Sequence, residues 1–187
     1  MASDAGLPAD LGAGGDGVLI LLIGLPAVGK TTLAKLLAGE LGAGIIDRDV
    51  IGRSVFPSRY FTLSAAQVTC AGAICVEVAR TIMAERDDAR IIIDGFTFSR
   101  KSDIDMFVSV AEQTRYRLYL IECVADEAVV KKRIEADEEG LNKQRDWNKY
   151  VTVRDRFEPL DHVDLTVDLT DDPESACRQV LELVGRA

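Results

Sequence analysis

The stretch GLPAVGKTTLAKLLAGELG, residues 24–42, decides the fold of this chain. It begins with the pattern G-x-x-x-x-G-K-[ST], from Gly24 to Thr31. The apolar run GVLILLIG leads into it, and leucines at helical spacing follow it. A buried strand, a glycine-rich turn and a helix start, in this order, surround phosphate oxygens with backbone N–H groups. The stretch therefore predicts a P-loop that binds the phosphates of a nucleotide.

The residues of this loop have distinct expected tasks. Gly24 and Gly29 allow backbone conformations and close approaches that a side chain would block. Lys30 is expected to reach the outer phosphates, and the Thr31 hydroxyl is expected to ligate Mg²⁺ that bridges them. The predicted cofactor-binding residues of the loop are Gly24, Ala27, Val28, Gly29, Lys30, Thr31 and Thr32.

Strand-like and helix-like segments alternate along the rest of the chain. Short apolar runs predict strands within residues 17–24, 43–49, 90–95, 116–125 and 162–170. Helical spacing predicts helices near residues 33–42, 64–85, 103–114, 126–140, 148–158 and 172–184. This order predicts one α/β domain over residues 18–187, a five-stranded parallel sheet with helices on both faces, after a disordered leader at residues 1–17.

Composition and charge narrow the class of protein. The 187-residue chain has 22 Lys and Arg against 31 Asp and Glu, a net charge of −9. Nucleic-acid affinity comes largely from neutralised phosphates, so nucleic acid is a less favoured partner, although a local basic groove could override this. No apolar run reaches the roughly 18 residues of a membrane span. The first 17 residues lack the basic start and the apolar segment of a signal peptide.

The cysteines do not form a metal-binding pattern. The sequence has no C-x-x-C pair among its four cysteines, Cys70, Cys75, Cys123 and Cys177, and its only histidine is His162. A zinc site is therefore not expected. We expect four buried free thiols in a cytoplasmic protein.

The terminal phosphate has three possible fates: hydrolysis as a timing signal, hydrolysis for mechanical work, or transfer to a hydroxyl. A regulatory GTPase should carry N-K-x-D, but the nearest string, NKQRD, has one residue too many. A mechanical ATPase usually carries Glu directly after its strand-end Asp, whereas Gly95 follows Asp94. Both absences favour transfer to an acceptor.

Transfer requires a group that accepts the proton of the acceptor hydroxyl. The string IIDRD offers Asp47 and Asp49 at the end of the second strand, on one face if the strand runs that far. Asp49 is the preferred base because it opens the next element, and Asp47 could instead face Lys30 or Mg²⁺. Both acids could also be simple turn or helix-cap residues.

The third strand ends in a second group of polar residues. Asp94 is expected to hold Mg²⁺ through water or to contact substrate, although a strand-end Asp is also a common cap. Gly95 would let a ligand approach the backbone. Thr97 and Arg100 follow on the same rim, and Arg100 could equally be a solvated charge at a helix start.

A mobile cover should supply cations to the transferring phosphate. The polar segment at about residues 136–149 is the expected lid. Arg133 at its start is the preferred catalytic arginine, with Arg145 next, and each could be only a surface charge. Trp147 and Tyr150 are expected to pack at the hinge of the lid.

Four stretches between Gly24 and Asp161 carry a family resemblance: GLPAVGKTTLAKLLAGELG, IIDRDVIGRSVF, IIIDGFTFSRKS and VRDRFEPLD. With these, the chain resembles the P-loop kinase group that contains polynucleotide 5′-kinase domains, zeta toxins and chloramphenicol phosphotransferase. Within that group it is similar to the bacterial AAA-type predicted kinases. The resemblance implies a three-layer P-loop kinase fold, ATP and Mg²⁺ at Gly29, Lys30 and Thr31, a general base at Asp49 and a strand-end acid at Asp94.

Two departures from the family pattern bear on the acceptor. Many members carry Arg three residues after the basic Asp, but here Gly52 occupies that place and Arg53 follows. Either Arg53 substitutes for it or the contact is lost. The family's D-x-T-N string also lacks its Asn, and Phe96 and Phe98 flank Thr97. We interpret both changes as favouring an apolar or aromatic small acceptor over a polynucleotide.

Three functions remain open at this stage. The preferred one is an ATP-dependent kinase for the hydroxyl of a small molecule such as a nucleoside, sugar or antibiotic. The second is a 5′-hydroxyl kinase for RNA or DNA ends. The third is a nucleotide-binding partner protein with little turnover. Oligomeric state does not follow from the sequence.

Overall fold

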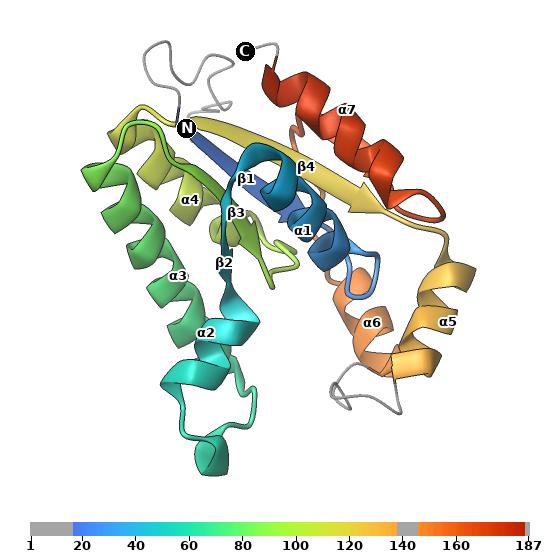
Figure 1. Ribbon diagram of the computed structural model, residues 1–187. Helices are drawn as coiled ribbons and strands as arrows, with labels where there is room; N and C mark the ends of the chain where they lie inside the picture. The colour runs from blue at the N-terminus through green and yellow to red at the C-terminus, as the bar shows by residue number, and fades with distance from the viewer. Residues whose placement is uncertain (1–16, 138–145, 186–187) are drawn as a thin grey trace, which may run out of the picture.

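The structure is a computed structural model that describes residues 17–137 and 146–185. Within these ranges, five parallel strands form one sheet in the order β2-β3-β1-β4-β5 (Figure 1). The strands are β1 (Val18–Ile23), β2 (Gly44–Asp47), β3 (Arg90–Asp94), β4 (Arg117–Val124) and β5 (Leu165–Asp168). The five-stranded parallel sheet predicted from the sequence is confirmed.

Strand β1 is central and buried along its whole length. Its alternate residues belong to two different cores, because successive side chains point to opposite faces of a sheet. Val18, Ile20 and Leu22 pack in one core, and Leu19, Leu21 and Ile23 pack in the other. A strand covered on both faces needs a continuous apolar run, which is why the alternation is absent from its sequence.

Helices cover both faces of the sheet (Figure 1). One face carries α1 (Lys30–Leu41) and α7 (Pro173–Gly185), and the other carries α3 (Ala65–Glu85) and α4 (Lys101–Thr114). The remaining elements lie toward the carboxyl ends of the strands: α2 (Arg48–Val55), η1 (Ser58–Tyr60), α5 (Glu127–Asp137) and α6 (Trp147–Arg154). This end of the sheet is where open α/β sheets bind their ligands.

The sequence located the helices but missed one. Ser64 caps α3 by accepting from the backbone N–H of Gln67 at 3.4 Å, and Asp172 caps α7 by accepting from Ser175 at 2.8 Å. Helix α4 begins two residues before the predicted start, and α6 ends at Arg154 instead of continuing to Pro159. Helix α2 was not predicted, because only eight residues form it and its sequence has no extended periodicity.

Two predicted segments lie mainly outside the described residues. They are the leader at residues 1–17 and the middle of the lid, residues 138–145. Gly17 itself is described, and it is buried against Tyr116 as part of the fold. The lid boundaries are helical, since α5 runs to Asp137 and α6 starts at Trp147.

Among the described residues, α3 is long and apolar enough to cross a membrane by length and composition alone. In the fold it is a core helix of the α/β domain. Ala71, Cys75, Ala79 and Met83 line its buried side. Packing against the sheet and the neighbouring helices accounts for the apolar residues on this side.

Candidate functional site: a phosphate cradle facing an acidic helix start

The P-loop has a backbone that only particular residues can adopt. Gly24 and Gly29 have φ values of 147° and 117°, and Ala27 lies between them at 61°. A Cβ atom on Gly24 would lie 2.3 Å from the carbonyl oxygen of Cys123. The Gly24 N–H donates to the Thr97 carbonyl at 3.1 Å, which joins the P-loop to the loop after β3. Gly24 is therefore required both by its φ and by the contact with β4.

Lys30 opens helix α1 and is buried, with 8 % of its surface exposed. Its Nζ donates to the carbonyls of Gly24 at 2.8 Å and Leu25 at 2.7 Å. No side chain caps the start of α1, and its first turn has no acidic residue. The helix start therefore presents backbone N–H groups and a positive dipole end to an anion. Thr31 and Thr32 are exposed in this first turn.

Asp94 ends β3 beside the cradle and is 2 % exposed. Its Oδ1 has no hydrogen-bond partner among the described residues. A buried carboxylate oxygen without a partner is costly, and such groups commonly serve a ligand. Mg²⁺ typically takes one or two protein oxygens together with phosphates and water. Asp94 and the hydroxyl of Thr31 fit that donor set, whereas no group of three or more His, Cys, Asp or Glu among the described residues could hold a metal.

Asp47 and Asp49 do not lie together on one face of strand β2. Strand β2 ends at Asp47, and Asp49 lies in the first turn of α2. The Asp47 Oδ1 accepts from the N–H groups of Asp49 at 2.7 Å and Val50 at 3.1 Å. Asp47 is thus the N-cap of α2, one of the alternatives open from the sequence. A contact of Asp47 with substrate, Lys30 or Mg²⁺ remains a prediction.

Asp49 remains accessible, with 24 % of its side chain exposed. The backbone nitrogen of Asp49 lies close to the loop after β3, since a Cβ atom on Gly95 would be 3.0 Å from it. The same loop reaches the P-loop through Thr97 and Gly24. The Asp49 backbone, residues 95–97 and the P-loop are therefore contiguous at one end of the sheet.

Arg48 is a residue of this site that the sequence did not indicate. Its Nη2 lies 3.2 Å from Asp49 Oδ1, and its guanidinium lies 4.8 Å from the centre of the Phe96 ring. Phe96 in turn stacks on Phe98 with ring centres 4.8 Å apart. Arg48 is thus held between an aromatic ring and the candidate base. Its position in IIDRD was visible, but the ring that holds it is far along the chain.

The two phenylalanines of FTFSRK do not face an acceptor. Phe96 is 5 % and Phe98 is 1 % exposed, and both pack edge-on against Phe107. The interpretation that these rings favour an aromatic acceptor is wrong, because both rings are buried in the core and not exposed to a ligand. Between them, the Thr97 hydroxyl bonds Ser99 at 3.2 Å. Arg100 is exposed immediately before α4.

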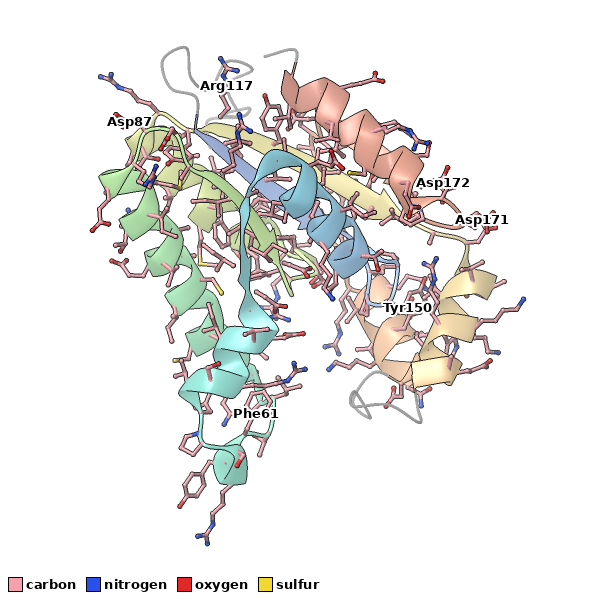
Figure 2. All side chains as sticks on the ribbon, in the orientation of Figure 1. Phe61, Asp87, Arg117, Tyr150, Asp171 and Asp172 are labelled. Carbon is pink, nitrogen blue, oxygen red and sulfur yellow. The ribbon has the colours of Figure 1, made fainter. Side chains whose placement is uncertain are left out.

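Gly52 is buried in α2 for a packing reason. A Cβ there would lie 3.5 Å from the Phe61 ring and 3.7 Å from the Ala71 Cβ, and Phe61 lies beside α2 in Figure 2. These are ordinary van der Waals distances, so a side chain at this position would start against Phe61 and Ala71. Arg53 follows on the exposed surface of α2. Its predicted contact with substrate remains a prediction.

Arg133 contacts the P-loop through backbone carbonyls. Its Nη1 donates to Val28 at 2.8 Å, and its Nη2 donates to Leu169 at 2.8 Å and Thr170 at 2.9 Å. The side chain lies on α5 at the start of the expected lid, as predicted. Arg145 lies outside the described residues.

Trp147 and Tyr150 stack at the other end of the lid, with ring centres 4.8 Å apart. Tyr150 is buried on α6 (Figure 2), and Lys131 lies 5.5 Å from the Trp147 ring. Both aromatics therefore pack together at the start of α6, and their place at the hinge of a lid remains a prediction.

The segment after α6 is tied to the loop after β3. Glu158 accepts from the Lys101 N–H at 2.7 Å, and its own N–H donates to the Ser99 carbonyl at 3.0 Å. Asp161 pairs with the Lys101 side chain. The stretch VRDRFEPLD thus fixes the start of α4, a role that its sequence did not reveal.

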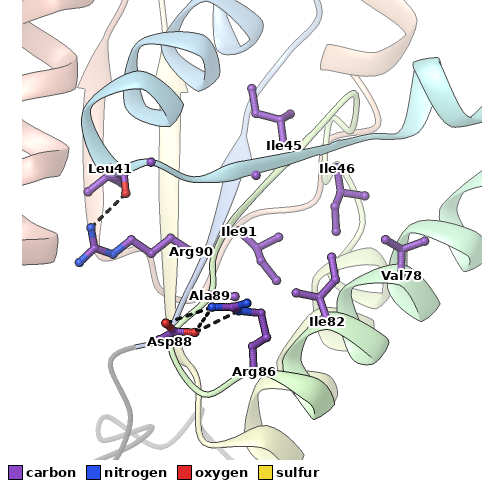
Figure 3. Close-up of a pocket in the computed structure, with 12 residues that line it drawn as sticks. Leu41, Ile45, Ile46, Val78, Ile82, Arg86, Asp88, Ala89, Arg90 and Ile91 are labelled. Carbon is purple, nitrogen blue, oxygen red and sulfur yellow. Dashed lines mark hydrogen bonds and ion pairs between the residues drawn. The ribbon is translucent and has the colours of Figure 1, made fainter.

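A hollow of about 770 Å³ lies at the opposite end of the sheet (Figure 3). Its lining comes from β2, the start of β3, α3 and the end of α1, and it includes Ile45, Val78 and Ile82. None of the predicted site residues lines it. The volume of this hollow therefore says nothing about the phosphate site.

The cysteines are free thiols, and three of them are buried. Burial raises the pKa of both Cys75 and Cys123 to about 12. Burial also raises the pKa of Cys177 above its usual value. Cys70 is exposed on α3, so the prediction of four buried thiols is wrong for this one. Its helical position places it on the side of α3 turned away from the core.

A family model described as an AAA domain matches residues 19–160. The chain belongs to the AAA domain family. No curated protein matches this chain. The matched region begins in β1 and ends two residues after Glu158, so it includes the P-loop, α2 and Asp94.

Solved structures share the fold of this AAA domain at low sequence identity. A candidate kinase from Chloroflexus aurantiacus J-10-fl has a TM-score of 0.74 at 23 % identity, covering 92 % of this chain and 98 % of its own. The APS kinase of Mycobacterium tuberculosis, in complex with AMPPNP and APS, gives 0.67 at 15 %, with coverages of 90 % and 98 %. A gluconokinase from Sinorhizobium meliloti 1021 gives 0.66 at 17 %, with 91 % and 93 %. The resemblance to small P-loop kinases and the predicted fold are thereby confirmed.

Proposed function

We propose that this AAA domain protein is an ATP-dependent phosphotransferase that moves the terminal phosphate to a hydroxyl group of a small molecule. The observation that carries the proposal is the contiguity of three parts. The P-loop bonds the loop after β3 through Gly24 and Thr97, and that loop packs on the backbone of Asp49. This contiguity of the backbone supports a shared rim for the phosphate cradle and the accessible Asp49 carboxylate, which is what an in-line transfer requires.

Each residue of the site has its own proposed role in the transfer. The first turn of α1 and Lys30 would bind the phosphates of ATP, with Lys30 exchanging its carbonyl partners for phosphate oxygens. Thr31 and Asp94 would hold Mg²⁺, which neutralises charge on the phosphates. Asp49 would accept the proton of the acceptor hydroxyl, and Thr97, Arg53 and Arg100 would contact the acceptor from either side. Gly95, where a water-activating Glu stands in mechanical ATPases, leaves no second base at this place.

The proposed acceptor is a small molecule. The solved structures that share this fold at low identity include an APS kinase, a gluconokinase and a sugar kinase. The net charge of −9 also disfavours a polyanionic acceptor. A small polar hydroxyl compound suits the rim better than an aromatic one, since Phe96 and Phe98 are buried.

Transfer from labelled ATP to a panel of acceptors tests this function. The panel contains nucleosides, sugars, sulfated nucleotides, hydroxyl-bearing antibiotics and 5′-hydroxyl oligonucleotides. We expect label on a small molecule. Label on an oligonucleotide would establish the polynucleotide kinase alternative, and ATP binding without any transfer to the panel would favour the partner-protein alternative.

Two variants test the assigned roles once an acceptor is found. Lys30→Ala should abolish the thermal stabilisation by ATP, with Lys35→Ala on the exposed side of α1 as control. Asp49→Asn should keep ATP binding and lose about 10²-fold or more of the transfer rate, the scale of general-base catalysis. Asp105→Asn, an exposed acid on α4, is its matched control. Full transfer by the Asp49→Asn protein would exclude Asp49 as the base.

A further inference from the structure

Arg133 makes three hydrogen bonds to backbone carbonyls of two distant segments. Its Nη1 donates to Val28 at 2.8 Å, inside the P-loop. Its Nη2 donates to Leu169 at 2.8 Å and to Thr170 at 2.9 Å, directly after β5. The guanidinium therefore joins the phosphate cradle to the last strand of the sheet.

The bond to Val28 bears on the shape of the cradle. Val28 is 2 % exposed and lies between Ala27 and Gly29, both of which have positive φ. In a planar trans peptide the C=O of one residue and the N–H of the next point in opposite directions. Holding the Val28 carbonyl on the Arg133 side therefore turns the Gly29 N–H to the other side of the loop.

We propose that Arg133 is a positioning residue that fixes the Val28–Gly29 peptide of the P-loop before nucleotide binds. The inference rests on the proposed function in one respect, the binding of phosphates by this loop. It differs from the role of a lid arginine, because the guanidinium acts through the backbone of the cradle and not on the transferring phosphate. Arginine suits this task, since its planar fork presents several donors in a fixed geometry.

The two roles predict different consequences of Arg133→Lys. Lysine keeps the positive charge but cannot reproduce the fork. A contact to phosphate would depend largely on charge, and its loss would not alter the protein without nucleotide. A positioning role predicts that the P-loop loosens even when no nucleotide is present.

Hydrogen–deuterium exchange without nucleotide, together with titration calorimetry with ATP and Mg²⁺, tests the inference on the full chain. For both Arg133→Lys and Arg133→Gln we expect about tenfold faster exchange over residues 24–32 and 169–170, unchanged exchange in α4, and about tenfold weaker ATP binding. Lys132→Gln, an exposed neighbour on α5, should match the wild type in both measurements.

The outcomes separate this inference from the proposed function. Unchanged exchange at residues 24–32 in the Arg133→Lys protein would overturn the positioning role, whatever the ATP affinity. Faster exchange combined with a wild-type protein that binds no ATP would support the positioning role and refute the proposed function. If the variants do not fold, NMR couplings across the hydrogen bonds from the Arg133 guanidinium to the Val28 and Leu169 carbonyls decide the question in the wild type. Absence of these couplings would overturn the inference.

Discussion

Replacing Gly24 by alanine tests the geometry of the P-loop directly. The added Cβ would lie 2.3 Å from the carbonyl oxygen of Cys123, and real Cβ atoms essentially never come within 3.0 Å of another atom in this way. That oxygen belongs to the backbone of β4, so it cannot rotate away. The φ of 147° at Gly24 adds strain of its own for any residue with a side chain.

The expected loss of stability follows from these two terms. Overpacking against a fixed atom typically costs about 1–3 kcal/mol, and an unfavourable backbone conformation costs about 1–3 kcal/mol. Together they predict that Gly24→Ala lowers the free energy of unfolding by roughly 2–6 kcal/mol. In a domain of this size that corresponds to a fall in Tm of roughly 5–20 °C.

Gly39→Ala is the matched control, since it makes the same chemical change in helix α1. A Cβ on Gly39 meets nothing within 4 Å. Alanine is the better helix former by about 0.5–1 kcal/mol, so this variant should be slightly more stable than the wild type. Thermal and urea unfolding, with and without ATP and Mg²⁺, give both values. A Gly24→Ala protein as stable as Gly39→Ala would refute the close approach of the P-loop to β4.

The remaining predictions concern the cysteine thiols, the contact of Arg48 with the Phe96 ring, and the buried Asp94. Since burial raises the pKa of Cys123 to about 12, its thiolate is scarce at pH 8. Mass spectrometry after iodoacetamide treatment should therefore find the exposed Cys70 alkylated well before Cys123. Equal rates of alkylation would contradict the packing of β4. A double-mutant cycle of Arg48→Met and Phe96→Leu in urea unfolding should give a coupling of about 0.5–2 kcal/mol, the scale of a partly desolvated cation–π contact, and additive effects would exclude that contact. Asp94→Asn should leave the Tm without nucleotide unchanged or higher, because it removes a buried carboxylate. In the presence of ATP its affinity for Mg²⁺ should fall on the order of 10–100-fold. An undiminished affinity for Mg²⁺ would exclude Asp94 from the metal site.

Several features were predictable because they are encoded locally. The order of strand, glycine-rich turn and helix around Lys30 appears within one stretch of sequence, and the structure has the strand, the turn and the helix there. The caps Ser64 and Asp172 are recognised from the residues that follow them, since a cap bonds an N–H only three residues away. The apolar run of β1 was sufficient to predict a buried strand for the same reason.

The contacts of the candidate site were not predictable in this way. Asp47 and Asp49 are two residues apart, yet only the end of β2 and the start of α2 assign one to a helix cap and the other to the rim. Phe96 looked like a contact for the acceptor, but packing against Phe98 and Phe107 uses its ring in the core. Such assignments depend on which segments surround a side chain, and periodicity does not contain that information.

By itself, the sequence determined the P-loop, the alternation of strands and helices, and the acids that end β2 and β3, because each is a pattern among near neighbours. Tertiary structure decided what those residues touch. Arg133 bonds Val28 across 105 residues, and Arg48 reaches the ring of Phe96 from another strand end. A guanidinium takes whatever carbonyl, carboxylate or ring the fold brings within reach, so its role is fixed only when the sheet and its helices have assembled.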